Sequence, residues 1–212
     1  IERPVTKESG YLKDSLLKNI YVQTKTGQPS LTLEFPFIDN RDKWKSKPNQ
    51  YVSRLLNSQE ENSLFSYLTD EGYIEGGVAS INPNVWGADG AVFFDFTLTS
   101  KGLANKDLVI DLTFKYIDLI STQGINKKYY DEMKAINDRE FEDYTPPQAL
   151  SMAVNFGSQI FDVPIENLID YNLRTDFFDE KAIQDVLSQL VPSNVRIYHL
   201  SPDESTSIDL KY

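Results

Sequence analysis

The stretch from Glu71 to Thr99 reads EGYIEGGVASINPNVWGADGAVFFDFTLT and predicts an antiparallel β-hairpin. Two strand-like runs, Tyr73 to Ile81 and Ala88 to Leu98, are rich in the β-branched and aromatic residues that strands prefer. Turn-forming residues separate the runs, namely Asn82, Pro83 and Asn84 with a Trp86-Gly87 corner. We expect the rest of the chain to be organised around this hairpin.

The second run of the hairpin alternates in a way that defines its two faces. One face is wholly apolar, and the other is mixed. The apolar residues are Val92, Phe94, Phe96 and Leu98, and those between them are Ala91, Phe93, Asp95 and Thr97. Because successive side chains of a strand point to opposite faces, the apolar set is expected to lie on the core.

The first run contains residues with almost no side chain, Gly76, Gly77, Ala79 and Ser80. Such a strand lets another backbone approach closely, so an extended peptide could add to it at a sheet edge. A β-bulge, or tight packing under a helix, would also explain the small residues. The residues alone leave these alternatives open.

The remaining pattern predicts an α+β fold, because most helices follow most strands and no βαβ alternation occurs. Further strands are expected at 17–24, 30–37 and 194–200, with Pro36 marking an edge position or a strand end. Helices are expected at 51–56, 64–68, 103–120, 126–141, 149–160 and 179–190. Caps are expected at Thr99 or Ser100, Gly72, Gly124 and Asp179, with a helix start at Pro146-Pro147. The apolar stripe of the helix after Pro147 would be Ala149, Ala153, Phe156 and Ile160. We predict one domain over residues 1–203 and a linker or tail over 204–212.

The composition excludes several classes of function. The 212 residues carry a net charge of −11, which argues against a nucleic-acid surface. No apolar run is long enough to span a membrane. The absence of cysteine excludes disulfides and thiolate ligands. The chain begins Ile1-Glu2-Arg3-Pro4 with no visible signal peptide, as expected of a piece of a longer polypeptide.

No catalytic residue and no metal ligand is predicted. His199 is the single histidine, so neither H-E-x-x-H nor its inverse can occur, and a structural role in the last strand is favoured. No G-x-S-x-G, phosphate-binding loop or calcium loop is present. Acidic clusters at 60–61, 70–71 and 140–143 are expected to be solvated surface. Trp44 and Trp86 could stack on a ligand or plug the edge of the core.

The order of segments resembles the non-catalytic domains of the insulinase family of zinc metallopeptidases, and most of all the second domain of large single-chain, pitrilysin-like members. The residues that carry the resemblance are LEFPFID (33–39), KWKSKPNQYVSRLL (43–56), NSLFSYLTDEGYI (62–74), AVFFDFTLTSKGL (91–103) and PSNVRIYHLSP (192–202). Together they cover residues 17–203. The resemblance implies a LuxS/MPP-like metallohydrolase fold, with a mostly antiparallel sheet covered on one face by helices.

The resemblance also implies a function. In this family two bowl-shaped halves enclose a chamber for unfolded peptides, and the zinc ligands belong to another domain. This chain would then bind no cofactor itself, and zinc would belong to the parent enzyme. A strand of the second domain anchors the substrate by β-pairing, and the matching residues here are Gly76, Gly77, Val78, Ala79, Ser80 and Ile81. The family's glycine pair would align with Ala79 and Ser80, whereas the glycines here are Gly76 and Gly77, so the resemblance does not fix the register of this strand. On this basis Ala79→Arg is expected to weaken peptide capture without unfolding.

The predicted function is therefore a non-catalytic domain of a zinc metalloendopeptidase, forming chamber wall and a substrate-anchoring exosite. Its expected partners are extended peptides and the other domains of the parent protease, with a periplasmic location in a bacterium. Activity is not expected from this chain alone. Two alternatives stay open, a non-peptidase scaffold subunit of the same fold and a ligand-binding module that uses Trp44 or Trp86.

Overall fold

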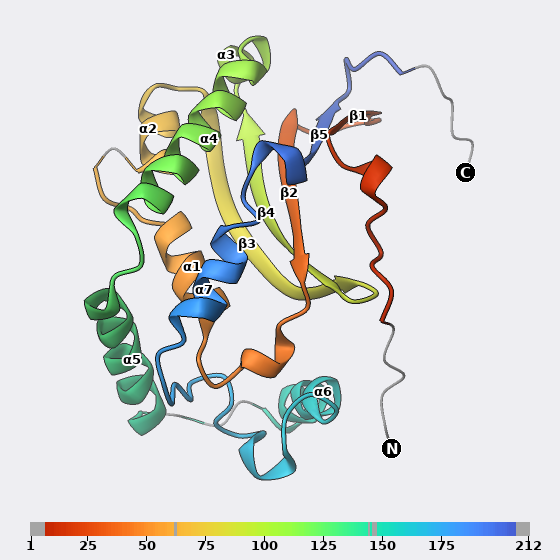
Figure 1. Ribbon diagram of the computed structural model, residues 1–212. Helices are drawn as coiled ribbons and strands as arrows, with labels where there is room; N and C mark the ends of the chain where they lie inside the picture. Colours follow the sequence, from red (N-terminus) through yellow and green to blue (C-terminus); the bar gives the residue numbers. More distant parts are fainter. Residues whose placement is uncertain (1–6, 62, 144, 146–147, 207–212) are drawn as a thin grey trace.

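The computed structural model describes residues 7–61, 63–143, 145 and 148–206, and Figure 1 shows its arrangement. Within these residues the strands form a five-stranded sheet of order β1-β5-β2-β4-β3. The strands are β1 (Lys18–Gln23), β2 (Ser30–Ile38), β3 (Ile74–Trp86), β4 (Asp89–Leu98) and β5 (Arg196–Ser201). The pairings are antiparallel except that β1 runs parallel to β5. The predictions made for residues 1–4, Pro146-Pro147 and 207–212 lie outside the described residues.

The helices lie mainly on one face of the sheet, as predicted for this α+β fold (Figure 1). They are α1 (Pro48–Leu56), α2 (Leu64–Asp70), α3 (Ser100–Ala104), α4 (Lys106–Gln123), α5 (Lys127–Glu142), α6 (Ala149–Gln159) and α7 (Glu180–Leu187). Short 3₁₀ turns are η1 (Lys13–Ser15), η2 (Arg41–Lys43), η3 (Ile165–Asn167) and η4 (Pro192–Asn194). The predicted single domain over 1–203 stays a prediction.

The core lies between the sheet and these helices. The alternating apolar face of β4 is buried, as predicted, and it packs with the odd-numbered residues of β2. These residues are Leu31, Leu33, Phe35, Phe37, Val92, Phe94, Phe96 and Leu98. Burial of this many large side chains, each contributing about 1.5–3 kcal/mol relative to exposure, holds the helical layer on the sheet.

Local signals fix several helix ends as predicted. The Thr99 hydroxyl accepts a hydrogen bond from the Gly102 amide at 3.0 Å, and the Asp179 carboxylate accepts one from the Ala182 amide at 3.0 Å. Gly72 and Gly124 follow helix ends with φ of +70° and +75°, a conformation that costs glycine little. The predicted helix at 103–120 is instead two helices, because it breaks at Asn105 between α3 and α4.

Two expectations about the strands need correction in detail. Asn82, Pro83 and Asn84 do not separate the two strands, because β3 continues through them to Trp86 with a register shift. The turn itself lies at Gly87, as the predicted Trp86-Gly87 corner requires. Pro36 lies in a central strand, yet β5 pairs only with residues 30–34 of β2. Pro36 lies outside the part of β2 that pairs with β5, and its carbonyl accepts a hydrogen bond from the Asn194 side-chain amide at 2.8 Å. The N–H that proline lacks is therefore not needed for pairing with β5.

Helix α6 forms where expected, but its apolar stripe is not in the core. No residue of α6 is buried, and of the predicted stripe only Phe156 is half-buried. Leu150 and Val154, four residues apart on one face, are 77% and 63% exposed. The helical period was right, but a period alone does not say which face meets the rest of the protein.

The sheet face opposite the helices carries a buried acid. Glu34 is 3% exposed and accepts hydrogen bonds from the hydroxyl of Tyr11 at 2.6 Å and that of Tyr198 at 2.8 Å. The Arg196 guanidinium contacts the same carboxylate at 2.7 Å. Burial, and then the bond to Glu34, raise the pKa of Tyr198 to about 12. This cluster attaches the segment before β1 to the open face.

Candidate substrate-binding edge

The six residues predicted to bind substrate, Gly76 to Ile81, lie on β3, which is the edge strand of the sheet beside β4. Residues 76–82 pair with residues 91–97 of β4 without interruption. The Ala79 side chain is only 2% exposed and belongs to the core, while the Val78 side chain is 49% exposed. The strand therefore offers its backbone at the edge and alternate side chains on the open face.

The backbone of Ala79 is already bonded by a side chain. Asn57 follows α1, and its amide nitrogen donates to the Ala79 carbonyl at 2.7 Å. Its amide oxygen accepts from the Ala79 N–H at 2.9 Å. Both backbone groups of Ala79 thus point away from β4, and the carboxamide of Asn57 takes the place of a peptide unit of a further strand.

The orientation of Ala79 fixes that of its neighbours. Because the backbone groups of a strand alternate in direction, Gly77 and Ile81 also direct their N–H and C=O groups away from β4. We find no hydrogen bond to these outward groups in the described part of the chain. The available edge is therefore Gly77 and Ile81, with the Asn57 amide between them.

The structure also supplies physical reasons for the small residues that need no ligand. A Cβ on Gly77 would come within 2.5 Å of the Phe65 ring of α2, so close packing under a helix explains this glycine. The pairing shifts register between Ile74 and Gly76, which is a bulge. A Cβ on Gly76, in contrast, would meet nothing within 4 Å. Packing against a neighbouring side chain therefore does not explain the glycine at position 76.

A shallow hollow lies on the open face beside this strand. Its volume is about 410 Å³, and Gly76, Gly77 and Val78 line one side of it. The far side includes Asp95, whose carboxylate accepts a hydrogen bond from the Thr32 hydroxyl at 2.6 Å. A side chain of a strand added at the edge could enter this hollow.

The expectation for Ala79→Arg was wrong, because it assumed that this side chain was accessible. An arginine at a core position that is 2% exposed would bury a charge with no partner, so the domain would unfold. Tests of the edge must alter its backbone or Asn57 instead. Sequence reasoning missed Asn57, whose one signal was its position as a polar residue just after a helix.

Asn57→Ala is expected to lower the free energy of unfolding by about 1–2 kcal/mol, because its amide bonds to Ala79 are lost. Denaturation in urea measures this change. Gln23→Ala removes an exposed amide that bonds the Pro202 carbonyl, and it should change stability by less than about 0.5 kcal/mol. Equal stability of the two variants would mean that the Asn57 amide does not hold the edge.

The other residues singled out in the sequence have separate surroundings. His199 is buried, contacts the Asn19 amide oxygen at 2.9 Å and stacks on Tyr21 with ring centroids 4.6 Å apart. Burial, and then the Lys106 ammonium, lower the pKa of His199. Trp86 is exposed at the end of β3, and Trp44 lines a separate pocket. Within the described ranges, no cluster of three acidic or histidine side chains could hold a metal, and no helix could cross a membrane.

Comparison with known families decides the relationship. The model of the peptidase M16 inactive domain matches residues 4–137. The chain belongs to this family. Protease 3 of Escherichia coli (strain K12) is 31% identical over 174 residues, which are 82% of this chain and 18% of that protein. Insulin-degrading enzyme of Drosophila melanogaster is 28% identical over 186 residues, 85% of this chain and 18% of that protein.

A solved structure agrees with this assignment to the M16 inactive domain. The crystal structure of pitrilysin superposes with a TM-score of 0.88 at 28% identity, over 95% of this chain and 22% of that chain. The predicted resemblance and the α+β fold class are therefore confirmed. The M16 inactive domain described here spans about a fifth of the length of these relatives.

Proposed function

We propose that this M16 inactive domain forms part of the chamber wall of a zinc metalloendopeptidase and anchors extended peptides by adding them to the β3 edge. The observation that carries the proposal is the outward backbone of Gly77 and Ile81 on an edge strand. Main-chain hydrogen bonds bind an extended peptide with little regard to its sequence. The hollow beside Val78 supplies room for a side chain.

The helical side supports a role inside a larger protein. Apolar side chains that are exposed here gather on α6 and on the segment after it. They are Leu150, Val154, Ile160, Ile165 and Ile169. Exposed apolar side chains of this size are frequent at interfaces, and in this proposal the other domains of the parent protease cover them.

The experiment is a titration of the chain with an extended peptide, free and N-acetylated, followed by the backbone amides in NMR. Shifts are expected at residues 76–81, with the largest at Gly77 and Ile81, and acetylation should weaken them if the peptide's amino end is held. Shifts confined to another part of the sheet would refute the edge as the anchor. If no binding is detected at millimolar peptide, the anchoring role is refuted and only the role as part of the chamber wall remains proposed.

Two further parts of the proposal rest on the family relationship. The zinc would be bound by a domain outside this chain, and the parent enzyme would be periplasmic. The second candidate, a scaffold subunit of the same fold, is distinguished by the parent gene, because a peptidase must encode an H-x-x-E-H segment. Activity of the parent protein that disappears with a chelator would support the peptidase.

A further inference from the structure

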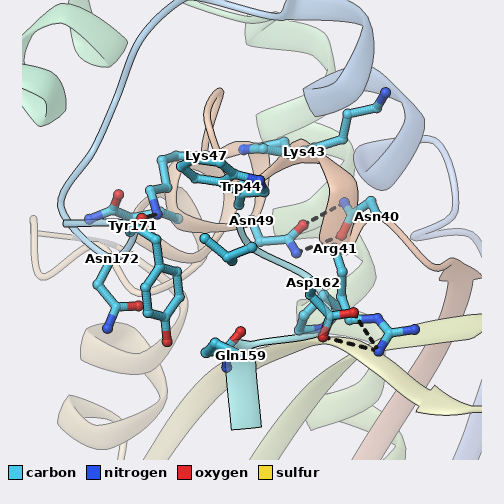
Figure 2. A pocket seen from close by; sticks show the side chains of 14 residues that line it. Asn40, Arg41, Lys43, Trp44, Lys47, Asn49, Gln159, Asp162, Tyr171 and Asn172 are labelled. Atoms are coloured by element: carbon cyan, nitrogen blue, oxygen red, sulfur yellow. Dashed lines mark hydrogen bonds and ion pairs between the residues drawn. The ribbon is translucent and has the colours of Figure 1, made fainter. Parts of the chain in front are cut away.

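A second concave site lies apart from the β3 peptide edge. A cavity of about 280 Å³ opens between the segment leading into α1 and the segment that follows α6. This volume is near the lower limit for small-molecule sites, which begin at about 300 Å³. Figure 2 shows Lys47, Tyr171 and Asn172 on one side and Arg41 with Asp162 on the other. Trp44 adds an indole ring to the lining.

Lys47 is held in an unusual backbone conformation at this site. It directly precedes α1 with φ of 53° and ψ of 43°, a left-handed conformation that is uncommon for lysine. Its ammonium donates to the backbone carbonyl of Tyr171 and lies 5.8 Å from the centre of that ring. An ammonium has three donors, so the carbonyl leaves others for a ligand.

The charge of Lys47 is not neutralised by an ion pair within the described residues, whereas the other cations of the lining are paired. Arg41 contacts Asp39 at 2.6 Å and Asp162 at 3.3 Å. Lys43 contacts Asp42 at 3.0 Å and points away from the pocket in Figure 2. Burial lowers the pKa of Lys47 to about 8, and the more distant Asp170 and Asp176 oppose this shift.

The remaining residues that line the cavity carry no charge, and they are either polar or apolar. Asn40 and Asn49 bond each other through both amides at 2.8 Å, so they form a closed wall. Gln159 and Asn172 add amides, and Trp44 and Tyr171 add flat apolar surface. A half-buried ammonium beside aromatic rings suits an anion that carries an apolar group.

We propose that this cavity binds a carboxylate attached to a flat apolar group, with the Lys47 ammonium as its anchor and Trp44 and Tyr171 as its walls. The carboxylate can belong to the C-terminus of a peptide or to a small organic acid. The site does not depend on the β3 edge, and nothing in its lining is shared with Gly76 to Ile81.

The test is calorimetric titration of the chain with N-acetylphenylalanine and with its uncharged amide. The carboxylate is expected to bind at least tenfold more tightly than the amide. Lys47→Met should remove this preference, and Lys45→Met, which removes a neighbouring ammonium outside the lining, should keep it. Equal binding of acid and amide by the wild type would overturn the proposal, as would an unchanged preference in Lys47→Met.

A pH series on the wild type tests the anchor even if Lys47→Met does not fold. The charged and titratable groups around Lys47 and the cavity are Arg41, Lys43, Lys45, Asp162, Asp170, Asp176 and the Tyr171 phenol. The bond to Asp42 raises the pKa of Lys43, and burial raises the pKa of Tyr171, so both shifts run opposite to that of Lys47. The affinity for N-acetylphenylalanine should therefore fall several-fold between about pH 7 and 9.5 as Lys47 loses its proton. Constant affinity would contradict Lys47 as the anchor.

The source of the carboxylate is decided by a third comparison. A short peptide ending in phenylalanine is titrated with a free and with an amidated C-terminus. Preference for the free end assigns the site to peptide C-termini, while binding of N-acetylphenylalanine alone assigns it to small acids. If neither acid binds more tightly than its amide, the cavity is not a carboxylate site.

Discussion

Glu34→Ala is expected to lower the free energy of unfolding by about 3 kcal/mol, because it leaves a largely buried guanidinium without its carboxylate. Arg196 contacts Glu34 at 2.7 Å with its side chain only 18% exposed. The hydroxyls of Tyr11 and Tyr198 lose their acceptor at the same time. The expected value is at the low end of about 3–5 kcal/mol for breaking buried pairs, since Arg196 keeps some contact with water.

The measurement is the urea midpoint, with the slope checked for two-state behaviour. Glu75→Ala is the matched control, because Glu75 is an exposed strand carboxylate that accepts a hydrogen bond from Gln28 at 2.7 Å. It should cost less than about 0.5 kcal/mol. A Glu34→Ala variant that loses no more than the about 0.5 kcal/mol typical of surface changes would show that the cluster contributes little.

Much of the fold could be predicted from local patterns. The alternation in β4 identified the buried face, because a period of two assigns each side chain to a side of the sheet. Thr99, Asp179, Gly72 and Gly124 marked helix ends, since caps depend only on neighbouring backbone groups. The position of β3 at the sheet edge was expected from the family resemblance, but no local pattern fixes it, because strand order depends on contacts distant in sequence.

The candidate sites depend on contacts that no local pattern encodes. Asn57 bonds a backbone 22 residues away, and Phe65 covers Gly77 from another helix. The Lys47 cavity joins the segment around α1 to residues 159–172. Small residues in β3 were visible in the sequence, but whether each one serves a helix, a bulge or a ligand required the structure. The adjacent Gly76 and Gly77 differ in this respect, because a Cβ on Gly77 would meet the Phe65 ring and a Cβ on Gly76 would meet nothing within 4 Å.

N-methylation of an extended peptide at every second residue is expected to weaken its binding to the chain at least tenfold in one of the two possible registers. A strand added to β3 directs alternate N–H groups toward Gly77 and Ile81, and a methyl group there removes a hydrogen bond and blocks the approach. Methyl groups shifted by one residue point away from β3, so that peptide should bind within about twofold of the unmodified one. The affinities are measured by the same amide titration.

Variants of the chain test the same pairing from the protein side. Ile81→Pro removes one outward N–H and leaves the hydrogen bonds between β3 and β4, so it should lower peptide affinity several-fold, whereas Ile81→Val should not. Asn57→Ala frees the backbone of Ala79 and should raise affinity, because the amide competes for the groups a peptide strand would use. If both registers of N-methylation weaken binding equally, or neither does, the peptide is not held as an added strand. Its contacts would then be through side chains, and the hollow beside Val78 and Asp95 would be the site to alter next.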